Sequence, residues 1–286
     1  MKNKESFCVK DQVMNLKRSR ITACMTLILS VLALFACLTG VLEKSLYEEV
    51  LSAGTITNSL VVGSIGQDII FIPLALLLAL LSVIYLNQPG YKIFITLLGL
   101  TCNFFYGYGL YAMQGQYTSI YLIYLAIFGL SIYSIVFGLS SFTAGFSTKT
   151  LLPKALTRAI SIFLFSIVSI LSLIWLLRIT PDIARHIPQD TYGVFILDLG
   201  IVFPAITIAA MRLIRKMPFG NILAGIALMK VFTVCLSWGF GEWYCRFRGT
   251  IQGGYDMLVI PSVLTVISLL FFGLYMARLK YAGDSK

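Results

Sequence analysis

Long apolar runs, separated by short polar segments, dominate the chain from residue 21 onward. A helix needs about 20 consecutive apolar residues to cross a bilayer. We predict a membrane-spanning helix over each of eight segments: 21–42, 67–86, 93–113, 119–139, 159–177, 192–211, 221–240 and 257–277. The runs are continuously apolar, which favours helices over the alternating strands of a transmembrane barrel. The predicted fold class is an all-α polytopic integral membrane protein.

The second half of the chain repeats polar and glycine positions of the first at a spacing of 130 residues. Asp68 then corresponds to Asp198, and Gly90 to Gly220. We interpret the chain as two four-helix halves, 21–139 and 159–277, with a linker (140–158) and two tails (1–20 and 278–286). Because each half has an even number of spans, the duplication would be parallel. The alternative is that polar starts and Pro-Gly turns recur in any membrane hairpin.

Composition and charge support a membrane location. The chain is 58% hydrophobic and 12% charged, with a mean hydropathy of +0.90, whereas soluble domains carry about 25% charged residues. The net charge of +10 does not indicate nucleic-acid binding, because Lys and Arg lie at the ends of apolar runs rather than on one face. Sixteen of them lie on the side of both tails and five on the other. This bias predicts cytoplasmic termini in the cell membrane, with the lipid bilayer as the partner.

The cysteines and the histidine indicate no metal or redox chemistry. The six cysteines form no Cys-x-x-Cys pair, and there is one histidine. Zinc knuckles and thioredoxin-type pairs require such spacings. We therefore predict no metal site and no cofactor.

Three stretches carry a resemblance to a known group of proteins: FFYGYGLYAMQGQY (104–117), YLIYLAIFGLSIYSIVFGL (121–139) and TYGVFILDLGIVFP (191–204). The chain resembles a group of uncharacterised multi-spanning bacterial membrane proteins over about residues 60–240. The third span of that group carries a Tyr-Asn-Tyr-like motif. Tyr106-Gly107-Tyr108 stands in its place here, without the Asn. The resemblance implies the architecture and no activity.

Two opposite charges fall within predicted spans. Such side chains cost about 2.5–3.5 kcal/mol on insertion scales and face the protein interior. Asp198 lies about six residues inside its span, and Lys230 about ten residues from the outer end of the next, antiparallel span. A lysine stem reaches across that difference in depth. We predict an Asp198–Lys230 ion pair, which acts either as a proton-linked switch or as a static packing contact.

Asp68 is predicted to lie at the outer mouth of the second span. It either contributes a polar site there or caps the helix N-terminus. The first-half counterpart of Lys230 is the apolar Leu100, so the two halves are not chemically equivalent. Pro73 and Pro204 are expected near the outer ends of their helices, where a proline in the first turn is tolerated.

Tyrosines recur at helical spacing on the third and fourth spans: Tyr108, Tyr111, Tyr121 and Tyr124. If their faces meet, they form an aromatic pocket suited to an amphiphile or a cation. The alternative is an aromatic belt at the membrane interface.

The last outer segment, GFGEWYCRFRGTIQGGYD (239–256), combines charge, glycine and aromatic residues. Glu242, Arg246 and Arg248 in it would form a lid or an anion site, or else a solvated surface.

Taken together, these features favour a transporter of ions or small molecules, of unspecified substrate. A non-catalytic sensor or assembly partner is the alternative. A membrane-embedded lipid or quinone enzyme is less favoured, because the spans lack clustered catalytic groups. We therefore predict no enzyme activity and no catalytic residue.

Overall fold

The computed structural model describes residues 14–43, 45–252 and 254–282. Most of the predicted tail 1–20 and the end of the tail 278–286 lie outside these residues. Eight helices of the described part are long and apolar enough to cross a membrane: α2 (Leu16–Leu42), α4 (Asn58–Asn87), α5 (Tyr91–Met113), α6 (Tyr121–Leu139), α8 (Lys154–Arg185), the composite helix Tyr192–Ile214, α11 (Gly220–Phe247) and α12 (Asp256–Arg278). Each matches one predicted segment, so the all-α multi-spanning fold is confirmed.

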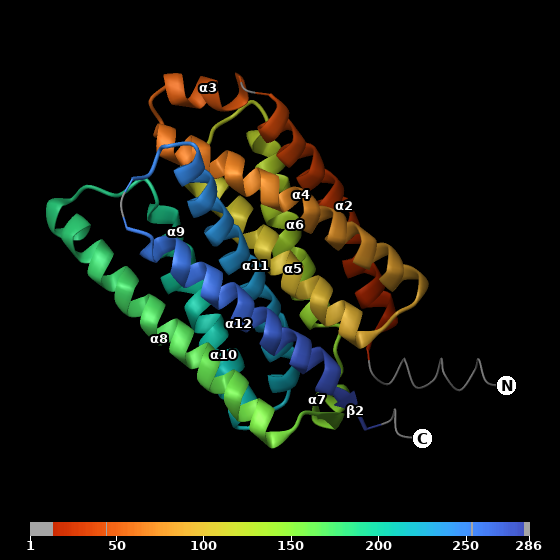
Figure 1. Ribbon diagram of the computed structural model, residues 1–286. Coiled ribbons are helices and arrows are strands. Elements are labelled where there is room, and N and C mark those ends of the chain that lie inside the picture. Colours follow the sequence, from red (N-terminus) through yellow and green to blue (C-terminus); the bar gives the residue numbers. More distant parts are fainter. Residues whose placement is uncertain (1–13, 44, 253, 283–286) are drawn as a thin grey trace.

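The helices of the two halves meet along α5 and α11, which are the most buried of the eight (Figure 1). In the first half, α2 packs against α4 and α6, and α5 packs against α6. In the second half, α10 packs against α8 and α11, and α12 covers α11. The centre of the bundle is therefore formed by one helix from each half.

Short elements close the two ends of the bundle. At one end β1 (Thr150–Leu151) pairs with β2 (Lys280–Tyr281), next to α7 (Ala144–Lys149). The first and last described residues, Met14 and Ala282, lie there, next to Phe142 and Lys149. Helix α3 (Ser45–Ser52) lies at the opposite end (Figure 1). We call that opposite end the α3 end.

Helix α4 begins nine residues earlier than the sequence predicts. Thr57 caps it by accepting a hydrogen bond from the Leu60 N–H. Small and polar residues such as Gly63, Ser64 and Gln67 lower the hydropathy of the first turns and hide the true start. They face other helices, where their polarity is tolerated.

Glycine lets helices approach closely at Gly107, within the Tyr-Gly-Tyr motif of α5. A Cβ atom there would lie 2.4 Å from the ring of Phe71 on α4. The Asn of the resembled motif would therefore displace Phe71 in this chain.

The composite helix of the second half consists of α9 (Tyr192–Leu197), the π-helical turn η1 (Asp198–Val202) and α10 (Phe203–Ile214). The Phe203 N–H donates to the Asp198 carbonyl, five residues back. Pro204 has no N–H, and its ring would clash with a carbonyl four residues back, which explains a wide turn just before it. Pro73, by contrast, lies in the middle of a continuous α4, so its predicted place near the helix end was wrong.

Candidate functional site

A cavity of about 330 Å³ lies between the two halves. Its walls come from α4 and α5 of the first half and from α8, α9, η1, α10 and α11 of the second. It reaches the surface at the α3 end, where the exposed Arg178 and Thr191 line it. Ligand pockets span about 300–1,000 Å³, so this cavity suits a small solute.

Asp198 and Lys230 both face this cavity. Asp198 is 6% exposed and accepts a hydrogen bond of 2.8 Å from the Trp175 indole N–H. Lys230 is 8% exposed, and its Nζ lies 4.4 Å from the centre of the Tyr106 ring. The buried location of both charges follows from their places on η1 and α11, which the bundle turns inward.

The predicted direct ion pair between these two residues was wrong. Their charged atoms are more than 4.0 Å apart, outside the range of an ion pair. Each is held by an aromatic neighbour instead: the Trp175 indole binds Asp198, and the Tyr106 ring lies under the ammonium group of Lys230. The cavity thus presents two opposite charges that do not neutralise each other by contact.

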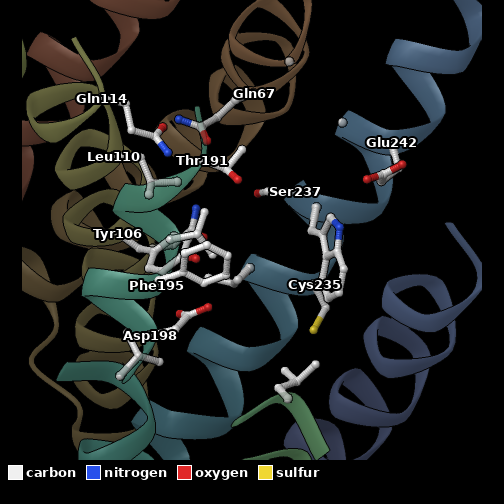
Figure 2. A pocket seen from close by; sticks show the side chains of 18 of the residues that line it. Gln67, Tyr106, Leu110, Gln114, Thr191, Phe195, Asp198, Cys235, Ser237 and Glu242 are labelled. Carbon is white, nitrogen blue, oxygen red and sulfur yellow. The ribbon is translucent and has the colours of Figure 1, made fainter. Parts of the chain in front are cut away.

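Helix α5 adds a polar face that sequence reasoning missed. Asn103 and Tyr106 of α5 and Gln114, the residue directly after α5, line the cavity (Figure 2 labels the last two). Asn103 is 1% exposed, and neither polar atom of its side chain has a hydrogen-bond partner among the described residues. A buried polar group left without a partner costs about 1–3 kcal/mol. The spacing of Asn103, Tyr106 and Gln114 was the one signal in the sequence. It indicates a polar side of the cavity only when the position of α11 opposite these residues is known.

The polar groups lie at different depths in the cavity. Figure 2 shows Gln67, Gln114 and Thr191 on one side of Tyr106 and Phe195, and Asp198 on the other. Thr191 is exposed at the α3 end, so the amides lie toward the mouth and Asp198 lies deeper. A solute that enters from the α3 end therefore passes Arg178 and the amides before it reaches Asp198.

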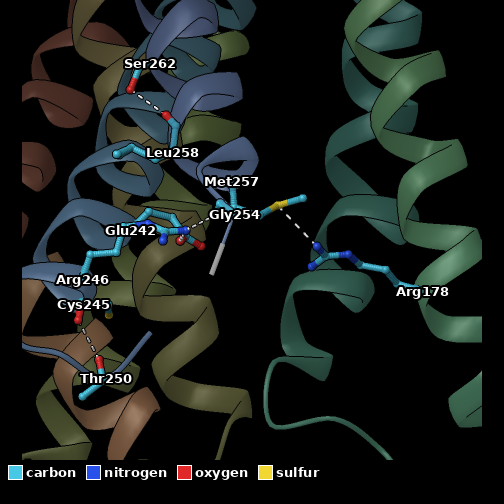
Figure 3. A network of polar contacts seen from close by, with 9 residues as sticks. All are labelled: Arg178, Glu242, Cys245, Arg246, Thr250, Gly254, Met257, Leu258 and Ser262. Atoms are coloured by element: carbon cyan, nitrogen blue, oxygen red, sulfur yellow. Dashed lines mark hydrogen bonds and ion pairs between the residues drawn. The ribbon is translucent and has the colours of Figure 1, made fainter. Parts of the chain in front are cut away.

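The predicted outer-segment group has a different structure. Glu242 and Arg246 lie in the last turns of α11, not in a loop, and their charged atoms are 3.8 Å apart. Arg246 also donates to the Gly254 carbonyl at 2.7 Å, which ties the following loop back to the helix (Figure 3). Arg248 directly follows α11 and is exposed. The prediction that all three residues form one anion site was therefore wrong. Glu242 lines the cavity.

A second polar contact crosses the mouth between helices. Arg178 of α8 donates to the Met257 sulfur of α12 at 3.3 Å (Figure 3). Arg178, Ile251 and Met257 all line the cavity, so this contact and the loop after α11 lie over its outer part.

Asp68 lies away from this cavity, in the interior of the first half. It is 1% exposed and accepts hydrogen bonds from Tyr47 (2.5 Å) and Tyr111 (3.0 Å). Burial and the nearby Asp68 carboxylate raise the pKa of the Tyr47 hydroxyl well above its ordinary value. Both predictions for Asp68 were wrong: it is not at a mouth, and Thr57 caps the helix.

The four predicted tyrosines do meet, as closely packed rings. The ring centres of Tyr108 and Tyr111 each lie within 5.8 Å of the centre of Tyr124. Tyr121 lies 6.4 Å from Tyr124 at the edge of the group. Tyr108, Tyr111 and Tyr124 are buried, so neither an open aromatic pocket nor an interfacial belt describes them. Tyr111 alone of the four lines the cavity.

No family model, curated protein or solved structure matches this chain. Within the ranges that the structure describes, no group of three or more His, Cys, Asp or Glu side chains could hold a metal ion. The fold and the site therefore define an all-α multi-spanning membrane protein with a polar cavity between two groups of helices. The resemblance to the bacterial group and the internal duplication stay predictions.

Proposed function

We propose that this protein binds a small polar solute in the cavity and carries it across the cell membrane. One observation carries the proposal: two opposite charges, Asp198 and Lys230, face a cavity inside an apolar bundle without pairing directly. A charge within a membrane is costly and marks solute or ion pathways when it faces a cavity. The protein keeps two such charges where packing alone would favour apolar residues.

The π-turn in the composite helix supports the same proposal. Asp198 opens the turn η1, and the Pro204 that follows it lacks the N–H that a regular α-helix would use there. π-turns are frequent at functional sites.

The distribution of Lys and Arg sets the proposed direction of access. It favours cytoplasmic termini, and the first and last described residues, Met14 and Ala282, lie at the end opposite α3. The mouth of the cavity then faces the outside of the cell. The solute therefore reaches Asp198 and Lys230 from the exterior.

Flux in proteoliposomes tests the proposal. Wild-type protein and the Asp198→Asn variant are reconstituted, and uptake of a mixture of neutral, cationic, anionic and zwitterionic solutes is followed by mass spectrometry. The matched control is Asp256→Asn, which makes the same change at an exposed carboxylate in the first turn of α12. We expect uptake of at least one solute class, lost in Asp198→Asn and kept in the control.

Two results would overturn the transport proposal. If uptake by the wild-type protein never exceeds uptake by protein-free liposomes, the transport proposal is wrong. Uptake that Asp198→Asn leaves unchanged rejects the cavity as the route. A solute that binds without flux would instead favour the alternative function, a membrane sensor.

A further inference from the structure

We infer that the solute is a zwitterion, with a cationic group bound at Asp198 and an anionic group bound at Lys230. This inference rests on the proposed function and names its substrate class. It starts from two opposite charges that line one cavity without a direct ion-pair contact, as described above. A molecule with one charge of each sign satisfies both residues, and the complex is neutral at that depth.

The cationic end of the solute is expected at Asp198. One carboxylate oxygen, Oδ2, already accepts the Trp175 N–H. A carboxylate accepts several hydrogen bonds, so the group retains capacity for an ammonium group in the cavity. The rings of Trp175 and Phe195 lie next to each other there, with centres 5.7 Å apart. The Arg178 guanidinium already lies over the Trp175 ring, 5.6 Å from its centre, so Phe195 offers the aromatic surface to a second cation.

The anionic end of the solute is expected at Lys230. Its ammonium group has three donors, and the Tyr106 ring face against which it lies uses none of them as a hydrogen bond. Asn103 precedes Tyr106 by one helical turn and lines the same cavity with its amide group unpartnered among the described residues. Its N–H donors and the ammonium of Lys230 together suit a carboxylate.

Solutes with a single charge fit this site poorly. A cation would neutralise Asp198 and leave Lys230 as an uncompensated buried charge, and an anion would do the reverse. A bound solute also displaces the cavity water around the charge that is left over, and a buried charge without a partner costs several kcal/mol. The outer charges do not restore the balance, because Glu242 has Arg246 beside it and Arg178 is exposed at the mouth.

The size and the walls of the cavity limit the rest of the solute. A water molecule occupies about 30 Å³ of liquid, so about 330 Å³ corresponds to roughly ten waters. The lining of the cavity also includes the apolar side chains of Phe71, Leu110 and Phe195. These residues suit a small apolar body, such as the side chain of a free amino acid.

Binding of three matched probes tests the inference. L-leucine has both charges, leucinamide lacks the carboxylate, and 4-methylpentanoate lacks the ammonium group. Binding to the full-length protein in lipid nanodiscs is followed by the fluorescence of Trp175 and Trp238, which line the cavity. A Trp243→Phe background removes the exposed third tryptophan. We expect leucine to bind at least about 100-fold more tightly than either analogue.

Two variants assign the ends of the solute. Asp198→Asn should weaken leucine binding while it leaves the affinity for 4-methylpentanoate unchanged or improved. Lys230→Gln should weaken leucine binding and spare or improve leucinamide. Asn103→Leu serves as a second test near the anionic end, in case Lys230→Gln fails to fold. If both variants lose the binding of all three probes to the same extent, the assignment of the cationic end to Asp198 and the anionic end to Lys230 is wrong.

The outcomes separate this inference from the proposed function. If a singly charged solute binds as well as leucine, or if only such solutes are taken up by proteoliposomes, the zwitterion inference is wrong and the transport proposal stands. If leucine binds with the crossed pattern but no flux occurs, the ligand class stands and transport is wrong. If no probe binds and no solute is taken up, both are wrong.

Discussion

Asp68 and Asp198 lie 130 residues apart, at the spacing that predicts the internal duplication, and both are almost fully buried. Asp68 is enclosed by the hydroxyl groups of Tyr47 and Tyr111. Asp198 has the Trp175 indole on one side and the cavity on the other. The same residue type thus fixes packing in the first group of helices and faces a cavity in the second.

The local backbone accounts for part of this difference. Pro73 follows Asp68 by five residues within a continuous α-helix, and Pro204 follows Asp198 by six. The additional residue coincides with the π-turn η1. The partner positions also differ, because Lys230 corresponds to Leu100, which is fully buried. The enclosed carboxylate therefore precedes its proline by five residues in a continuous helix, and the cavity-facing carboxylate precedes its proline by six at a π-turn.

The largest effect on stability is expected from Gly40→Ala. A Cβ atom at Gly40 would lie 2.0 Å from the Asp68 carboxylate. The carboxylate must move and lose its contact with Tyr47, so we expect the free energy of unfolding to fall by about 3 kcal/mol. Thermal unfolding in detergent measures this. Gly200→Ala in η1 is the control, since nothing lies within 4 Å of its added atom, and equal effects would contradict the enclosed state of Asp68.

A smaller loss is expected from Tyr47→Phe. It removes the hydrogen bond of 2.5 Å to Asp68 and leaves a buried carboxylate oxygen without that donor. Hydrogen bonds to charged groups contribute about 1.5–3 kcal/mol, and we expect a loss of about 2 kcal/mol in denaturant unfolding. Tyr133→Phe makes the same change at a 60% exposed side chain of α6 and should have little effect.

The contrast in access between the two sites can be measured with cysteines. Cys235 lines the cavity, whereas Cys37 is buried with its sulfur 3.3 Å from the Tyr108 hydroxyl. In variants that retain one of these two cysteines, we expect a small methanethiosulfonate reagent to modify Cys235 about tenfold faster, equivalent to about 1.4 kcal/mol. Mass spectrometry follows the reaction. Equal rates would show that the cavity does not admit small molecules.

The smallest effect on stability is expected from Asp198→Asn. The amide oxygen can still accept the Trp175 N–H, and water in the solute-free cavity can hydrate both the remaining amide group and the ammonium group of Lys230. We expect the free energy of unfolding to change by less than about 1 kcal/mol. A loss as large as that of Tyr47→Phe would mean that Asp198 is a structural residue like Asp68.

The sequence predicted the spans because bilayer length and continuous apolarity act locally along the chain. All eight spans were found, although the start of α4 was missed, since residues such as Ser64 and Gln67 are polar yet face other helices. The same hydropathy argument cannot tell lipid-facing from protein-facing polar residues. This is why Asp68 was placed at a mouth.

The candidate site was predicted only in part. Sequence spacing brought Asp198 and Lys230 to one region, but their separation depends on where Trp175 and Tyr106 pack. Asn103 was missed altogether, because a single amide in an apolar helix gains meaning only from the cavity that it faces. Contacts between distant helices decide these details, and periodicity along one helix does not report them.

The wide turn η1 also has a geometric consequence for the helix that follows it. Each residue of an α-helix advances the side-chain direction by about 100°, so one additional residue resets the phase between Asp198 and α10. That phase lets one span point its carboxylate into the cavity while Ile206, Ala210 and Leu213 stay buried. Deleting Gly200 would rotate the buried side chains of α10 relative to Asp198 by about 100°. The chain could then keep the Asp198 carboxylate in the cavity or the packing of α10, but not both.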